Sequence, residues 1–287
     1  MIASTRAELL RLRRWPTVWV LCGAWLALNL TFGYLFTYLS YRSEGGSGFA
    51  DQVSDQAEAQ ALLAQILPDQ VPVVLLQGLP MFGGALLLIL GAVTVGSGYG
   101  WGTWKTVFTT GPRRFTALAG TLAALGIVLV ALVLATLVVD LAAAFAVAGA
   151  ESQPMAWPGL VDTVRSLGAG VLIGAMWTAA GVLLGTLTRG PALAVGLGLV
   201  WALVVENLLR GVANLLGAVA AVTDVLPGSA AGSLAGALGS VAEGDPGGTP
   251  GVNTVLDGGV ATVLLVGYLL AFLAASVLLT NRRDLAA

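Results

Sequence analysis

The chain has 287 residues, of which 57% are apolar and only 10% are charged, and its formal net charge is −2. A soluble domain usually carries about a quarter of charged residues, because its surface must face water. The composition, with a mean hydropathy of +0.90, therefore excludes an ordinary soluble protein. With no histidine and only Cys22, the sequence also predicts neither a disulfide framework nor a bound metal. We expect lipid around this chain and no nucleic-acid partner.

Long uncharged runs separate the charged residues. They predict membrane spans at about 15–40, 71–97, 115–147, 166–188, 190–209 and 258–281. A span needs about 20 apolar residues, and the run 190–209 reaches that length only if Glu206 lies near its outer end. The first run is too long and too aromatic for a cleaved signal peptide, so we expect it to be retained. The sequence thus predicts an all-α integral membrane protein with six transmembrane helices, forming a single domain over residues 1–287.

The basic residues predict the topology. Alternating spans place Arg6, Arg11, Arg13, Arg14, Lys105, Arg113, Arg114, Arg189, Arg282 and Arg283 on one side, and only Arg42, Arg165 and Arg210 on the other. Positively charged loops stay in the cytoplasm. We therefore expect both termini in the cytoplasm of a bacterial cell, a plasma-membrane location, and external segments at 42–69 and 211–257.

The residues before the first span predict a short helix. Thr5 and Glu8 have the spacing of a capping box. The helix would carry Glu8, Arg11, Arg13 and Arg14. We expect it to lie at the cytoplasmic leaflet as an interfacial helix; the alternative is a basic flank that only sets the topology.

The external segment before the last span is rich in Gly and Ala and is broken by Pro227, Pro246 and Pro250. Its apolar pieces, 212–222 and 229–242, are too short or too rich in glycine for full spans. We expect them to form re-entrant half-helices, which require protein or a water-filled cavity to cover their backbone.

Three ionisable residues fall within or beside apolar runs. Asp140 would cost about 2.5–3.5 kcal/mol at the centre of a span, which makes it a functional candidate; alternatively the long third span lets it reach the outer headgroups. Glu206 and Arg210 have the i,i+4 spacing of an ion pair. A structural pair and a transport site are the two readings of these residues.

Nothing in the sequence predicts catalysis by this chain. The glycines at 96, 98, 100 and 102 resemble a phosphate loop superficially, but no G-x-x-x-x-G-K-[ST] motif occurs. We expect a protein that is not an enzyme and holds no cofactor of its own.

The connection 98–118, GYGWGTWKTVFTTGPRRFTAL, carries the most specific pattern. It resembles the loop after the second span in ABC transporter permeases of the type-2 exporter group. The matching positions are Gly102, Thr103, Lys105, Pro112, Arg113 and Arg114. Two positions depart from the pattern: Gly98 stands where the family usually has an acidic residue, and Thr121 stands near the usual position of a lysine.

The resemblance implies a partner that supplies energy. Two permease chains, identical or homologous, would pair, and each would dock a cytoplasmic ATPase subunit that binds ATP and Mg. Residues about 102–114 would form a coupling helix for the ATPase. Its contacts would be Gly102, Thr103, Trp104, Lys105, Phe108, Pro112, Arg113 and Arg114. Because the spans contain few polar residues, we expect export of a hydrophobic or amphipathic substrate.

Two other functions remain open on sequence grounds. An ion- or proton-coupled secondary transporter would use Asp140 or Glu206 as its proton site, although no inverted repeat is visible. A non-transporting accessory membrane subunit would sense or scaffold. Co-purification of an ATPase would discriminate the first reading from these two.

Overall fold

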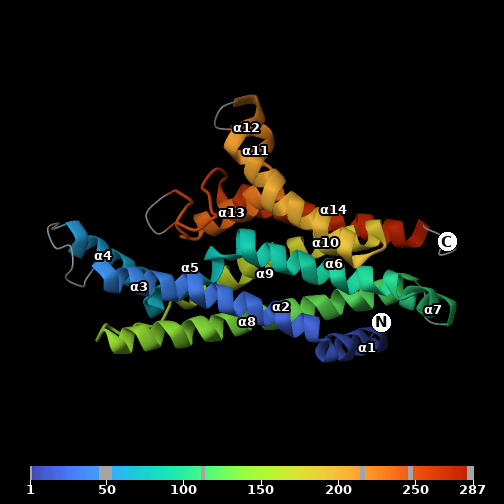
Figure 1. Ribbon diagram of the computed structural model, residues 1–287, viewed down its shortest axis with the longest axis horizontal. Helices are drawn as coiled ribbons and strands as arrows, with labels where there is room; N and C mark the ends of the chain where they lie inside the picture. The colour runs from blue at the N-terminus through green and yellow to red at the C-terminus, as the bar shows by residue number, and fades with distance from the viewer. Residues whose placement is uncertain (1, 45–53, 111–113, 214–216, 245–247, 283–287) are drawn as a thin grey trace.

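A computed structural model describes residues 2–44, 54–110, 114–213, 217–244 and 248–282. Six helices are long and apolar enough to cross a membrane, and these ranges contain no strand. We call them spans 1 to 6: Pro16–Arg42, Leu79–Gly100, Arg114–Ala150, Leu160–Thr188, Pro191–Val212 and Gly258–Arg282. They run side by side as an elongated bundle (Figure 1). The predicted all-α membrane protein with six transmembrane helices is thus confirmed.

Span 1 is built from three helical pieces. These are α2 (Pro16–Leu30), the π-helix η1 (Thr31–Leu35) and α3 (Phe36–Glu44). Pro16 occupies the first turn, where its missing N–H is no loss. The helix α1 (Ile2–Arg14) precedes span 1, separated from it only by the extended residue Trp15.

Span 2 begins later than the sequence predicts. The run from 71 is interrupted at Gly78, which separates α5 (Val71–Gln77) from the π-helix η3 (Leu79–Gly83) and α6 (Gly84–Gly100). Pro80 has no N–H to donate to a helical hydrogen bond. The Gly83 N–H donates to the carbonyl oxygen of Gly78, five residues earlier, at 2.9 Å, as in a π-helix. The helix α4 (Ser54–Gln65) precedes α5, and the two helices form a bent pair inclined by 56°.

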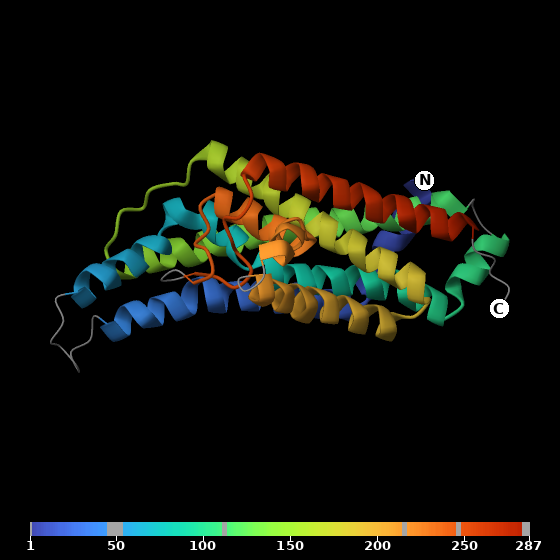
Figure 2. The same ribbon diagram turned by 90° about the horizontal axis from the view of Figure 1, so that it is seen from above.

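The centre of the bundle is the contact between α6 and span 4, which is α9 (Leu160–Thr188). A Cβ added at Gly91 would meet the Thr178 carbonyl oxygen, and one at Gly181 would meet the Leu88 carbonyl oxygen. Small residues at facing positions let two membrane helices approach this closely. Span 3, α8 (Arg114–Ala150), lies along α1 and span 1, and span 6, α14 (Gly258–Arg282), lies along α9 (Figure 2).

Span 5 consists of α10 (Pro191–Leu199), the π-helix η4 (Val200–Val205) and α11 (Glu206–Ala213). The helices α11 and α12 (Gly217–Asp224) project from the bundle, and α13 (Pro227–Ala237) returns into it (Figure 1). Residues 227–235 are all buried, largely under α14 and η3. Gly232 and Gly236 admit the backbone of Gly251 and Asn253. The helical pieces before span 6 therefore exist; their re-entrant position in a membrane stays a prediction.

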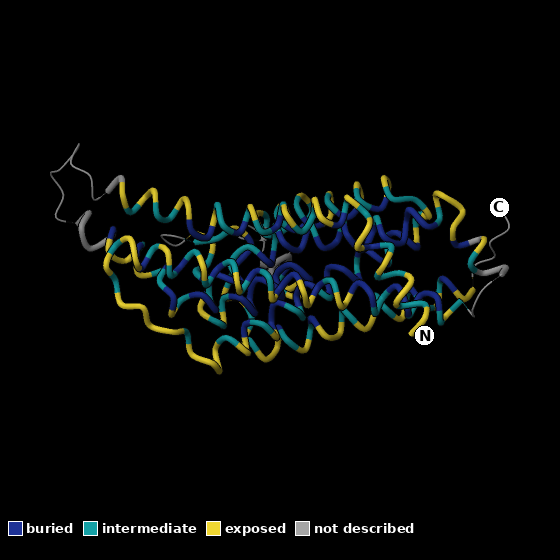
Figure 3. The backbone as a smooth tube through the Cα atoms, turned by 90° about the horizontal axis from the view of Figure 1, so that it is seen from below, coloured by how far each residue is buried: buried dark blue, intermediate teal, exposed yellow. Residues whose placement is uncertain are grey.

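The outside of the bundle is apolar where a membrane would surround it. Buried residues follow the middle of the bundle, and exposed ones follow the outer faces of the peripheral helices (Figure 3). Large exposed side chains on α14 include Val260, Val263, Leu270 and Leu278.

Candidate functional site

A short helix, α7 (Thr103–Thr110), lies in the connection between spans 2 and 3. The chain enters it through a turn in which Gly102 has φ +69°, a left-handed conformation that favours glycine. Thr103 is exposed at its start. The predicted contact residues Pro112 and Arg113 lie outside the described residues, as do the side chains of Lys105 and Phe108.

Trp104 points into the protein. Its side chain is only 5% exposed, and its indole Nε1 donates to the carbonyl oxygen of Val95 at 3.1 Å. The indole lies directly beside Gly98, where any side chain would collide with it. The structure thus explains why glycine stands at 98: the space is filled by Trp104. The resemblance implies an ATPase contact at Trp104, which stays a prediction; in this structure its ring packs against span 2.

The helix α1 is fixed to the same end of span 2. Leu12 is fully buried, and Arg11 Nη2 donates to the Thr94 carbonyl oxygen at 3.1 Å. Glu8 forms an ion pair with Arg11 at 3.1 Å; burial raises the pKa of Glu8, and the charge of Arg11 partly offsets that rise. Backbone and side-chain atoms of Ser4 lie against Gly120 of α8, where a Cβ would not fit.

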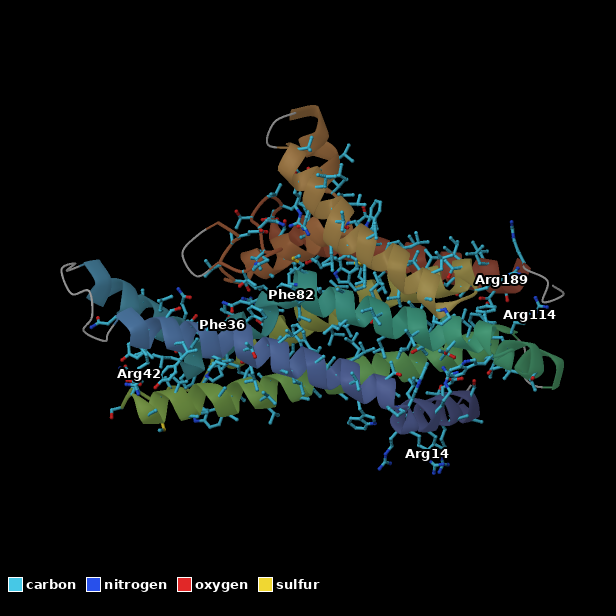
Figure 4. The ribbon with its side chains drawn as sticks, in the orientation of Figure 1. Arg14, Phe36, Arg42, Phe82, Arg114 and Arg189 are labelled. Carbon is cyan, nitrogen blue, oxygen red and sulfur yellow. The ribbon has the colours of Figure 1, made fainter. Side chains whose placement is uncertain are left out.

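The remaining basic residues of this end face outward or bridge spans. Arg13 and Arg14 are exposed, and Arg14 points away from the bundle (Figure 4). Arg114 starts span 3, and its Nη1 donates to the Thr280 carbonyl oxygen near the end of span 6 at 3.5 Å. In the predicted basic helix, Arg11 and Leu12 therefore pack against the bundle, whereas Arg13 and Arg14 form an exposed cationic face.

A row of polar contacts, the span 1–span 3 seam, joins α2–α3 to α8. Trp25 Nε1 donates to Thr136 Oγ1 at 2.9 Å, and Asn29 Nδ2 donates to Asp140 Oδ1 at 2.6 Å. Asp140 is 0% exposed, so its side chain lies inside the bundle; its depth in the membrane stays a prediction. Its Oδ2 and the hydroxyl of Tyr34 are buried without a hydrogen-bond partner among the described residues. Sequence reasoning found Asp140 but did not identify Asn29 as its partner.

The seam ends in a cluster around Glu151. Tyr38 and Tyr41 donate to its two carboxylate oxygens at 2.6 and 3.0 Å, and Arg42 Nε lies 3.6 Å from it. The hydrogen bond from Tyr38 lowers the pKa of Glu151, helped by Tyr41 and the Arg42 charge and opposed by desolvation. The only sequence signal for this cluster is that tyrosines and an arginine end span 1 where a glutamate follows span 3.

The expected Glu206–Arg210 ion pair is not formed. Neither of the ion pairs described in the structure, Glu8–Arg11 and Arg42–Glu151, involves them, and Arg210 Nε has no hydrogen-bond partner. Glu206 is 0% exposed, and its Oε1 accepts from Trp201 Nε1 at 3.0 Å. Its other oxygen lies against Gly228 at the first turn of α13. The i,i+4 prediction was wrong because the carboxylate turns inward to a helix N-terminus, which favours negative charge.

A cavity of about 450 Å³ lies between span 1 and the region where α5 meets η3. Its wall contains four aromatic residues, and none of the residues lining it is charged. Phe32 stacks on Phe82, with ring centroids 5.8 Å apart and planes inclined by 11°. Phe36 of α3 packs edge-on against Phe32, with ring centroids 5.2 Å apart, and also lines the cavity. Of the polar candidates from the sequence, neither Asp140 nor Glu206 lines this cavity.

The six apolar spans, the short helix held to the end of span 2 and the uncharged cavity define a polytopic α-helical membrane protein. No group of acidic or cysteine residues in the described ranges could hold a metal ion. The family model described as ABC-2 family transporter protein matches residues 2–285, so the chain belongs to this family. No curated protein matches the chain. Membership makes it a transmembrane subunit of an ABC transporter, which works in a membrane with an ATPase subunit.

Proposed function

We propose that this chain is the permease of an ATP-driven exporter that moves a hydrophobic or amphipathic substrate out of a bacterial cytoplasm across the plasma membrane. Two permease chains, identical or homologous, pair, and each binds one ATPase subunit. ATP and Mg act on those partners, and this chain itself is not an enzyme. The single observation that carries the proposal is the attachment of α7 and α1 to span 2.

That attachment supports a coupling role. Trp104 from α7 and Arg11 from α1 donate to the neighbouring carbonyls of Val95 and Thr94. A displacement of either short helix by a partner is therefore passed to span 2. A partner drives such a change only through contacts that differ between its own two states, which ATP binding and hydrolysis supply.

The charge distribution supports cytoplasmic termini. Arg14, Arg114 and Arg189 lie at the end of the bundle that holds α1, α7 and the end of α14, whereas Arg42 lies at the opposite end (Figure 4). The positive-inside rule assigns the end with the basic residues to the cytoplasm. Outward movement is the direction that the resemblance to exporters favours.

Substituting Trp104 tests the coupling. We expect Trp104→Ala to reduce substrate-stimulated ATPase activity of the assembled transporter at least tenfold, because α7 loses its hold on span 2. Trp101→Ala is the matched control, since Trp101 is 69% exposed three residues earlier. Trp104→Phe keeps most of the buried ring and distinguishes lost coupling from failed folding.

The same experiment distinguishes the alternatives. Equal activity of the Trp104→Ala and Trp101→Ala transporters would contradict coupling through α7. Substrate movement that follows a proton gradient without ATP would favour a secondary transporter, although Asp140 and Glu206 are both fully buried. An ATPase that co-purifies with the chain while no substrate moves would favour an accessory subunit.

A further inference from the structure

Two π-helical turns meet at the cavity. One is η1 in span 1, which carries Phe32, and the other is η3 in span 2, which carries Phe82. Such turns widen a helix and occur frequently at functional sites. Here they bring the two rings into a stack at 5.8 Å and form one wall of the cavity. The irregular turns therefore shape this wall of the cavity.

Three amides line the cavity, Asn29, Gln65 and Gln77, and of these Asn29 is the buried one. Asn29 lines the cavity and is only 5% exposed. Its Nδ2 donates to Asp140 Oδ1 at 2.6 Å. The NH2 group of Asn29 is the donor in this bond, so the contact with Asp140 sets the orientation of the amide. The carbonyl Oδ1 of Asn29, an acceptor, is then the amide atom available to a molecule in the cavity.

We propose that this cavity is the substrate site and that it selects an amphipathic molecule whose hydroxyl or amino group donates to Asn29 Oδ1. The hydrocarbon part of the molecule lies along Phe32, Phe36 and Phe82. Asp140 is a positioning residue, since it acts through Asn29. The inference deepens the proposed function and rests on it only for the direction of movement.

The dimensions and lining fit this ligand class. A volume of about 450 Å³ falls within the range of about 300–1,000 Å³ that holds small-molecule ligands. Anionic head groups are disfavoured, because no lysine or arginine among the described residues lines the cavity. A fully apolar molecule would leave the buried Asn29 acceptor without a partner, which costs affinity.

Photo-labelling of the purified full chain in lipid nanodiscs tests the inference. The probe is a dodecyl alcohol with a diazirine on its chain, and mass spectrometry locates the labelled residues. Unlabelled 1-dodecanol and its methyl ether serve as competitors, since the ether keeps the chain and loses the donor. We expect labels on the segments around Phe32 and Phe82, with 1-dodecanol competing about tenfold better than the ether.

Variants separate the two parts of the site. Asn29→Leu should abolish the difference between alcohol and ether while labelling continues. Asp140→Asn should reduce that difference, because an amide partner no longer fixes the orientation of Asn29. Phe82→Ala should weaken labelling by the probe and competition by both unlabelled molecules. Phe115→Ala, whose ring is 55% exposed on α8, is the control.

Three outcomes would overturn the proposal. The first is labelling confined to other surfaces. The second is equal competition by the alcohol and the ether in the unmodified chain, as an ordinary membrane lipid would give. The third is an unchanged preference for the alcohol in Asn29→Leu. The measurement needs neither ATP nor an ATPase. Its failure therefore leaves the coupling proposal standing, and failure of the Trp104 experiment leaves this site standing.

Discussion

Changing Gly181 to alanine should force spans 2 and 4 apart. The added Cβ would collide with the Leu88 carbonyl oxygen and lie 2.8 Å from the Ala92 nitrogen. Both are backbone atoms, so no side chain can turn aside to make room. Overpacking a tight site costs about 1–3 kcal/mol, and backbone neighbours place this site near about 3 kcal/mol. Alanine returns about 1 kcal/mol of helix propensity.

The net expectation is a loss of about 2 kcal/mol of unfolding free energy, or about 30-fold in the ratio of folded to unfolded protein. Gly91→Ala should behave alike, since its Cβ would meet the Thr178 carbonyl oxygen of the same contact. The two changes together should cost less than their sum, because the first already separates the helices.

Thermal unfolding of the purified chain in one detergent measures these effects. Gly126→Ala in α8 and Gly267→Ala in α14 are matched controls, because nothing lies within 4 Å of a Cβ at either position. They should leave the midpoint unchanged or raise it. If Gly181→Ala is as stable as Gly126→Ala, the close contact of α6 and α9 is not the centre of the bundle and the reasoning fails.

Two further predictions concern the acidic side chains. Hydrogen bonds lower the pKa of Glu151 below its usual 4.5. Its contribution to stability should therefore be complete near neutral pH and fade as the pH falls below about 4.5. The thermal midpoints of the unmodified chain and of Glu151→Gln should converge in that acidic range, and a constant difference between them would contradict this prediction. Arg210→Ala should change stability little, whereas Glu206→Ala should lower the midpoint clearly, because Glu206 holds Trp201 and the start of α13. An equal decrease of the thermal midpoint in both variants would indicate that Glu206 and Arg210 do form an ion pair.

The spans could be predicted from the sequence because a membrane imposes one simple rule: charges must leave its apolar interior. The position of charges therefore predicted six spans within a few residues at most ends. Gly78 and Pro80 carry no charge, so the interruption between α5 and span 2 left no trace in that pattern. The same rule could not distinguish α13, which is short and fully buried, from a surface segment.

Side-chain partners were less predictable, because they depend on contacts between distant parts of the chain. The Asn29–Asp140 bond joins residues 111 positions apart, and no local pattern pairs them. Glu206 had a suitable neighbour at i+4, yet α13 offered a helix N-terminus that the sequence could not place beside it. For Trp104, the informative signal was Gly98: a glycine in place of a side chain leaves space for a ring.

Span 2 connects the two proposed working parts of the molecule. Its C-terminal end is held by Trp104 and Arg11, and its N-terminal end carries Phe82 in the cavity wall. The interruption at Gly78 lies just beyond Phe82, so the helix of span 2 does not continue into α5, which packs on α8 and α9. On the proposed mechanism, a pull on α7 would be transmitted along α6 to Phe82 and change the shape of the cavity.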